Sequence, residues 1–195
     1  MRALSSSDTR QRLLDSTERL IYQGGISATG MDLIVKSSGV ARKSIYRYFN
    51  SKEDLVAAAL SARDQRWMEW FIQASSKAHH PDENLLSTFD ALETWFATPD
   101  FRGCAFINAA GEIGDVDAPV RIVAKEHKIK LHAHLRELTS KCVGPDADQL
   151  AAEFLILIEG AITVALIMGD KNSARQAKIM ATKLLSIAKE NNQPL

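Results

Sequence analysis

Apolar residues recur every three to four positions along most of this 195-residue chain, which is the spacing of amphipathic α-helices. Near the amino end, Leu13, Leu14 and Ile21 fall on one helical face, and the paired glycines at 24–25 end that segment. No segment alternates apolar and polar residues with a sustained period of two, so we predict no β-sheet. The pattern therefore predicts an all-α protein with about nine helices in total.

Capping residues and a glycine mark the first three predicted helices. Asp8 is placed to cap the first helix, and Thr29 or Gly30 is placed to cap a short second helix. The chain then turns at Gly39, and Val40 begins a third helix. Three helices are therefore expected before residue 51.

A capping motif and the prolines predict the rest of the helices. The segment 51–54 resembles a capping box, with Asp54 in place of the usual Glu, and it starts a long fourth helix. We expect this helix to run toward His79 and His80, where Pro81 stops it. Further helices are expected at roughly 83–97, 103–112, 118–142, 146–168 and 173–190.

The stretch from Gly39 to Lys52 combines a tight turn, a short amphipathic helix and side chains that are able to bind DNA. Its cations can meet phosphates or guanine edges: Arg42, Lys43, Arg47 and Lys52. Its other polar residues carry a hydroxyl group on a short side chain or on an apolar aromatic ring: Ser44, Tyr46 and Tyr48. A helix of this kind is suited to the DNA major groove, so DNA binding is the first hypothesis.

Composition limits the class of protein. The chain is 46% hydrophobic and 25% charged, which is typical of a soluble globular protein. We find no apolar run of the ~20 residues that a membrane span needs, and no secretory signal. Cys104 and Cys142 are too few for a disulfide framework and lack zinc-ligand spacing. We therefore expect a cytoplasmic protein that contacts no membrane and holds no metal or cofactor.

The formal net charge of zero averages two different parts of the chain. Residues 1–52 carry nine Lys or Arg and four Asp or Glu, a net charge of +5, and residues 53–195 carry −5. A basic domain at 1–52 would attract DNA, and an acidic larger domain at 53–195 would repel it. The alternative is that the charged residues cluster by chance and that the clustering has no function.

Short motifs follow one another along segment 8–60: Gly-Gly-Ile at 24–26, Ala-Thr at 28–29, Ile-Val-Lys at 34–36, Gly-Val at 39–40, Ser-Ile-Tyr at 44–46, Tyr-Phe at 48–49 and Ser-Lys-Glu-Asp-Leu at 51–55. With these motifs at this spacing, the segment resembles the N-terminal DNA-binding domain of the TetR family of transcriptional regulators. Residues 101–112 also look like one recurring type of TetR C-terminal domain. The resemblance implies a helix-turn-helix domain at 1–52 and a helical ligand-binding and dimerisation domain at 53–195.

The resemblance also implies which residues bind a double-stranded DNA operator. The expected contacts are Thr29, Arg42, Lys43, Ser44, Tyr46, Tyr48 and Lys52. Arg42 is expected at a guanine, because its planar fork can pair with O6 and N7 together. Thr29 and Lys52 are expected at phosphates, and Tyr46 and Tyr48 at the backbone or a thymine methyl group. Tyr46 can instead pack in the core, and the alternatives for the nearby Arg47 are plain solvation or a pair with Asp32.

The last two predicted helices are the candidates for a homodimer interface. Their apolar stripes contain Phe154, Leu155, Ile158, Ala161, Ile162, Ala165, Met180 and Leu184. As in the TetR family, two copies would form a four-helix bundle across a two-fold axis. The alternative is that these stripes are intramolecular core.

The middle helices hold most of the aromatic residues and could line a pocket for a small organic inducer. The candidate ligand-binding residues are Trp67, Trp70, Phe71, Phe89, Trp95, Phe96, Cys104, Phe106, Asn108, Glu112 and His127. Plain core packing is the alternative for each aromatic residue. Cys104 could also act as a redox or electrophile sensor, although a packing cysteine is the commoner role.

Enzyme motifs are missing from the chain, which has no Gly-rich phosphate loop, nucleophile elbow or metal quartet. The function expected is that of a repressor released from its operator by a small organic molecule. The alternative is a DNA-binding protein without such a switch, which a protein partner controls or which acts architecturally. The inducer, the operator sequence, the regulated genes and the choice between repression and activation are not encoded in these patterns.

Overall fold

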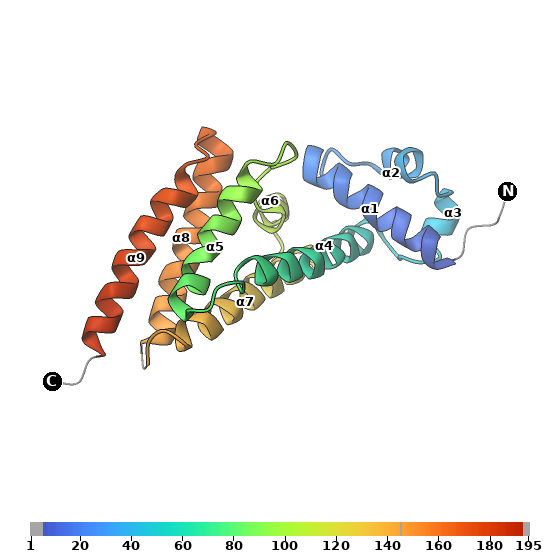
Figure 1. The fold of residues 1–195 in the computed structure, drawn as a ribbon. Helices are drawn as coiled ribbons and strands as arrows, with labels where there is room; N and C mark the ends of the chain where they lie inside the picture. Colours follow the sequence, from blue (N-terminus) through green and yellow to red (C-terminus); the bar gives the residue numbers. More distant parts are fainter. Residues whose placement is uncertain (1–5, 145, 193–195) are drawn as a thin grey trace. The chain divides into compact units, whose positions relative to one another are not determined.

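The computed structural model describes residues 6–144 and 146–192, and these residues form helices and connecting turns without any strand (Figure 1). In chain order the helices are α1 (Ser6–Gly24), α2 (Met31–Ser38), α3 (Arg42–Ile45), α4 (Lys52–Ala74), α5 (Pro81–Phe96), α6 (Ala105–Glu112), α7 (Pro119–Ser140), α8 (Ala147–Met168) and α9 (Ser173–Asn191). The predicted all-α fold is confirmed, and the last five helices lie within two residues of their expected bounds.

Two helix ends differ from the prediction. α4 ends at Ala74 instead of running toward His79 and His80, and the Ser75 hydroxyl donates to the Phe71 carbonyl at 2.8 Å. Pro81 does not stop α4 but opens α5, since its fixed φ and missing N–H suit the first turn of a helix.

The third helix also starts later than expected and is a single turn. It begins at Arg42, with Ala41 as its N-cap, and Val40 lies in the preceding turn. Gly39 adopts φ +66° and donates its N–H to the Val35 carbonyl at 2.9 Å, which ends α2. This left-handed conformation favours glycine and reverses the chain between α2 and α3.

The chain divides into two compact units, and the boundaries between them fall inside α4, just before α6 and inside α7. The N-terminal unit contains Met1–Arg66 and Ala105–His127, and the C-terminal unit contains Trp67–Cys104 and Lys128–Leu195. The compact units therefore place α6 with the first helices in space, whereas a boundary at residue 52 remains a prediction about function.

One apolar cluster holds the first four helices together. Its fully or nearly fully buried members are Leu13, Leu14, Ile34, Val40, Ile45, Phe49, Leu55 and Ala59. Burying one leucine or isoleucine stabilises a fold by about 1.5–3 kcal/mol. The one-turn α3 is therefore held in place by Val40 and Ile45, which lie on either side of its exposed residues, and by Phe49 in the turn that follows.

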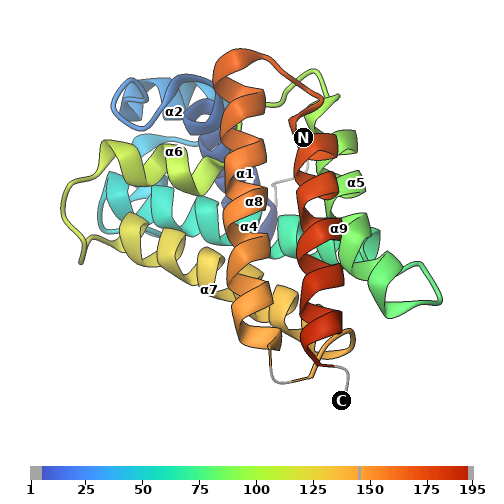
Figure 2. The ribbon, with the colours of Figure 1, turned by 90° about the vertical axis from the view of Figure 1, so that its left-hand side faces the viewer.

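In the C-terminal unit, α8 and α9 lie side by side, and α5 packs against both of them (Figure 2). Phe89 of α5 meets Phe154 of α8 with ring centroids 5.6 Å apart. The Ser173 hydroxyl at the start of α9 donates to the Ala161 carbonyl of α8 at 2.8 Å. Packing and this bond fix the register of α8 against α9.

α8 is long and apolar enough to cross a membrane, with a mean hydropathy of 2.2 in its most apolar window. The same helix supplies eight buried residues to the C-terminal unit, as the core helix of a soluble protein does. Its opposite side exposes Ile156 and Ile167, and Met168 is exposed at its C-terminal end. The composition of α8 is therefore explained by two apolar faces, one buried and one exposed.

Candidate nucleic-acid interface

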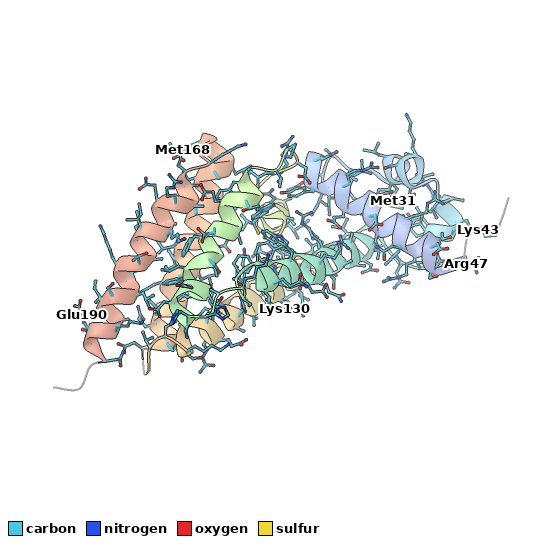
Figure 3. The ribbon with its side chains drawn as sticks, in the orientation of Figure 1. Met31, Lys43, Arg47, Lys130, Met168 and Glu190 are labelled. Carbon is cyan, nitrogen blue, oxygen red and sulfur yellow. The ribbon has the colours of Figure 1, made fainter. Side chains whose placement is uncertain are left out.

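The exposed side of α3 and of the turn that follows it carries the polar residues singled out in the sequence. Arg42, Lys43 and Tyr46 are exposed, and Ser44 and Tyr48 are half-buried. Figure 3 shows Lys43 and Arg47 at the same end of the N-terminal unit. We call these five residues with Arg47 the basic surface. Its side chains offer cationic and hydroxyl donors over an apolar interior, which is the chemistry that nucleic acid requires.

Arg42 forms an ion pair with Asp32 of α2, whose side chain is 97% exposed. Asp32, offered by the sequence as a partner for Arg47, pairs with Arg42 instead. An exposed pair of this kind contributes little to stability. Arg42 can therefore exchange Asp32 for a phosphate or a base edge at small cost.

The turn before α3 is held from α1. The Arg12 guanidinium donates to the Ser38 carbonyl at 2.7 Å, and the Val40 N–H donates to the Ser38 hydroxyl at 3.2 Å. A Cβ at Gly39 would lie 3.1 Å from the same guanidinium. This set of contacts fixes the direction in which the basic surface points relative to α1.

Two residues expected at phosphates serve the turn between α1 and α2. Thr29 is buried and its hydroxyl donates to the Gly25 carbonyl at 2.7 Å. The Lys52 amine, which is half-buried, donates to the Ile26 carbonyl at 2.7 Å. These placements do not favour a direct phosphate contact for Thr29, and they give Lys52 a second, structural task.

Glu112, at the end of α6, binds the other side of the same turn. Its two carboxylate oxygens accept the N–H groups of Ile26 and Ser27, each at 2.8 Å. Gly25 has φ +88°, and a Cβ there would come within 2.9 Å of Glu112 Oε1, so glycine is required. Partial burial raises the pKa of Glu112. The hydrogen bonds from Ser27 and Ile26 and the charge of Lys52 together lower this pKa by more, so it lies below its ordinary value. The ionised carboxylate thus connects α6 to the α1–α2 turn.

A small cleft lies beside this connection. Its empty volume is about 270 Å³, including space open to solvent, and it is lined by residues of α1, α4 and α6 and of the α1–α2 turn: Glu18, Ile21, Tyr22, Ile26, Leu60, Arg63, Ala105, Asn108, Ala109 and Glu112. Asn108 and Glu112 were among the expected ligand-binding residues. The other eight were not, and six of them lie on α1, the α1–α2 turn and α4, far from α6 in the sequence.

Two more expected ligand-binding residues pack together in the N-terminal unit. The Phe106 ring stacks on the His127 imidazole, with centroids 3.8 Å apart. His127 Nδ1 lies 2.7 Å from a carboxylate oxygen of Asp64, and both side chains are almost fully buried. Sequence reasoning missed Asp64, although an acidic residue one turn after the buried Leu60 on α4 is a signal of a buried polar partner.

The remaining expected ligand-binding residues lie in the C-terminal unit, and most of them form one aromatic cluster. Trp67 stacks on Phe71 at 4.8 Å, and Trp95 meets Trp67 edge-on at 5.6 Å. The ring centroids of Trp70 and Trp67 are 5.9 Å apart, and those of Phe96 and Trp95 are 6.0 Å apart. Phe89 packs on α8 instead, as described above. The cluster therefore brings together five of the residues that the sequence grouped.

The expected interface residues of the last two helices are mainly interior. Phe154, Ile158, Ala161, Ile162 and Ala165 are buried within the protomer, as the intramolecular alternative required. Leu155 and Leu184 are half-buried, and Met180 is 53% exposed. The large exposed apolar residues of α8 and α9 are Ile156, Ile167, Met168, Ile179, Met180 and Ile187, which we call the apolar face.

Metal-binding groups are missing from the described ranges, where no three His, Cys, Asp or Glu side chains gather at a distance suited to an ion.

Comparison with known proteins assigns both parts of the chain. Residues 13–59 match the family model of bacterial regulatory proteins, tetR family, and residues 81–181 match that of the tetracyclin repressor-like C-terminal domain. A TetR-family regulator from Streptomyces coelicolor is 25% identical, with a TM-score of 0.86 over 93% of this chain and 96% of the other. A putative TetR regulator from Streptomyces avermitilis is 29% identical, with a TM-score of 0.84 over 93% and 98%. The transcriptional repressor NemR of Escherichia coli is 29% identical over 118 residues, which are 58% of each chain.

Proposed function

This chain belongs to the TetR family of bacterial regulatory proteins, and from that premise we propose that it is a homodimeric repressor which a small organic molecule releases from its operator. DNA-binding transcriptional regulation follows from the family. Repression, the dimer and the inducer are the proposal. The basic surface over the N-terminal core is the observation that carries it.

The basic surface supports a recognition mode in which α3 enters the major groove. Arg42, Lys43 and Ser44 make up most of the single turn of α3, and the side chains of Arg42 and Lys43 are exposed. Arg42 is the residue suited to a guanine, and Lys43 and Arg47 are suited to phosphates. No side chain caps α2 at Gly30, so its first N–H groups supply a further phosphate site.

The apolar face supports the homodimer. A helix-turn-helix protein reads two half-sites one helical turn apart, and this requires two copies held at a fixed spacing. Exposed Ile156 and Ile167 on α8 with Ile187 on α9 offer a second copy the apolar contacts that obligate interfaces use. Residues already buried inside the protomer do not belong to this interface.

The inducer is proposed from the aromatic cluster around Trp67. Its stacked and edge-on rings favour an apolar or aromatic organic molecule over a sugar or a metal ion. Glu112 gives α6 a direct connection to the turn that precedes α2. A ligand that shifts α6 would act on the basic surface through this carboxylate.

A titration tests the proposal. Purified protein is titrated on fluorescent DNA from upstream of its own gene, with and without a set of aromatic and apolar organics. Release of the DNA by one compound class supports the proposal. Tight binding that no compound alters would favour a regulator governed by a protein partner.

A further inference from the structure

The small cleft beside α1, α4 and α6 is lined only by residues of the N-terminal unit. Half of this lining is apolar and nearly fully buried: Ile21, Ile26, Leu60, Ala105 and Ala109. Pockets for drug-sized ligands hold about 300–1,000 Å³. The empty volume of this cleft is about 270 Å³, part of it open to solvent, so the cleft suits a smaller molecule with one apolar ring or a short chain.

Arg63 of α4 is the cation in the lining of the cleft. Its Nη1 donates to a carboxylate oxygen of Glu18 at 2.8 Å, and its guanidinium lies over the Tyr22 ring, 3.9 Å from the centroid. The side chain is 16% exposed, so these two contacts hold the guanidinium in one place. A guanidinium carries five N–H donors in a planar fork, and the bond to Glu18 uses one of them. Arg63 is therefore positioned to bind a second carboxylate through its other donors.

The charges around the cleft favour an anion over a cation. Glu18 accepts hydrogen bonds from both Arg63 and Arg66, so its carboxylate lies between two guanidinium groups. The Glu112 carboxylate accepts two backbone N–H groups and lies near the charge of Lys52. Three cations around two carboxylates leave a net charge of +1, and both carboxylates already have donors. A ligand with one negative charge therefore complements this site.

We propose that this cleft is a second ligand site of the protein and binds a small organic monocarboxylate. The apolar body of the ligand lies against Ile21, Leu60 and Ala109. Its carboxylate accepts two parallel N–H bonds from the fork of Arg63, the geometry in which arginine binds carboxylates most strongly. The site belongs to the N-terminal unit, whereas the aromatic cluster around Trp67 belongs to the C-terminal unit.

Occupation of the cleft has a consequence for the regulator, and this part rests on the proposed function. A bound carboxylate contacts α1, α4 and α6 together, and Glu112 connects α6 to the α1–α2 turn beside the same cleft. A ligand stabilises the state of a protein that it binds best. The carboxylate should therefore hold α6 against the first helices and keep the protein on its operator, as a co-repressor that opposes the inducer.

Methyl NMR of the full chain tests the site without any DNA, with benzoate as the probe. In protein labelled at the isoleucine δ1 methyl groups, benzoate should shift the signals of Ile21 and Ile26 with a Kd of about 1 mM, as expected for so small a ligand. The signals of Ile156 and Ile167 on α8 should not move, and Ile21→Val and Ile26→Val assign the first two signals. Benzamide, the uncharged analogue, should bind at least about tenfold more weakly. Shifts that leave out Ile21 and Ile26, or equal binding of benzamide, would overturn the proposal.

Two arginine variants separate a direct contact from a general effect of charge. Arg63→Gln and Arg66→Gln each remove one positive charge and one bond to Glu18, but only Arg63 lines the cleft. Arg63→Gln should weaken benzoate binding by at least about tenfold, and Arg66→Gln by no more than about twofold. Equal weakening by the two variants would contradict the contact with Arg63. If Arg63→Gln does not fold, the comparison of benzoate with benzamide on the unaltered protein decides the matter.

Fluorescence anisotropy on operator DNA tests the regulatory part. Sodium benzoate at about ten times its Kd should raise operator affinity by up to about tenfold relative to sodium chloride of the same concentration, which controls for ionic strength. Unchanged or weaker affinity, under conditions where the Ile21 and Ile26 signals have shifted, would overturn this part alone. Failure of the protein to bind DNA without benzoate would instead count against the proposed function, because the NMR measurement is independent of DNA.

Discussion

The basic surface and the apolar face both expose side chains that the interior of their unit does not use, but their chemistry is opposite. Around α3, cations and hydroxyls lie over a small apolar core, and Ile45 and Phe49 hold them from below. Along α8 and α9, isoleucine and methionine lie over a core that is already filled. Each exposed surface is therefore complementary to a different kind of partner: a polyanion for the basic surface, and a second apolar surface for the apolar face.

The largest expected effect comes from placing charge on the apolar face. The double variant Ile156→Glu and Ile167→Glu should be a folded monomer, because both side chains are exposed and contribute little to the interior. Its operator affinity should fall by at least about a hundredfold, since one half-site no longer assists the other. Sedimentation velocity measures the mass of the particle in solution, and fluorescence anisotropy measures its affinity for the operator. Val116→Glu, at an exposed position outside the helices, is the control, and a double variant that remains a dimer would contradict the assignment.

The next effect belongs to the basic surface. Arg42→Ala should weaken operator binding by about 1–3 kcal/mol and relax the sequence preference at one base pair. Asp32→Ala removes the partner of Arg42 and should leave binding unchanged or stronger. Competition anisotropy with operator and scrambled DNA measures both. Equal weakening on every sequence would assign Arg42 to a phosphate instead.

A smaller and less specific effect is expected for Lys43→Ala. An exposed lysine at a phosphate should weaken binding to all sequences and reduce the slope of log affinity against log salt by about 1. Lys183→Ala, an exposed lysine on α9, is the matched control and should leave the slope as it is. A similar slope for both variants would place Lys43 outside the DNA contact.

The smallest effect concerns the connection from α6 to the α1–α2 turn. Glu112→Gln should lower the free energy of unfolding by about 1 kcal/mol near neutral pH, because the amide has one accepting oxygen, so one of the two hydrogen bonds is lost and the other loses its charge. The folded-state pKa of Glu112 lies below 4.5, so the wild type keeps this contribution above pH 4.5 and loses it as the pH falls through the folded pKa. Urea unfolding at several pH values should show the difference between the two proteins shrinking in acid. A constant difference would mean that the charge of Glu112 is not involved.

The helices could be predicted from the sequence because apolar spacing and capping residues act locally. The residues that make hydrogen bonds between distant segments could not. Thr29 and Lys52 are expected at phosphates, and the sequence did not indicate that their donors also bind carbonyls of the α1–α2 turn. Asp64 gave only a weak signal, because its partner His127 is 63 residues away.

Interfaces were harder to predict from the sequence than cores. An apolar stripe on α8 was recognised, but the helix has two such stripes, and the sequence alone does not say which one faces inward. The structure buries Phe154 and Ile158 and exposes Ile156 and Ile167. Pro81 shows the same limit at a helix end, since proline both ends one helix and begins another with equal ease.

The four-residue length of α3 has a consequence for any attempt to isolate DNA recognition. Starting a helix costs free energy that a single turn does not recover, so segments shorter than about 12 residues are mostly coil in water. A synthetic peptide of residues 39–52 should therefore give the circular dichroism of an unstructured chain. Such a peptide would lose conformational entropy when it binds DNA. In the whole protein this entropy is already lost on folding, when Ile45 and Phe49 enter the core. DNA recognition is thus a property of the folded N-terminal unit, and its affinity will fall with every mutation that loosens that core.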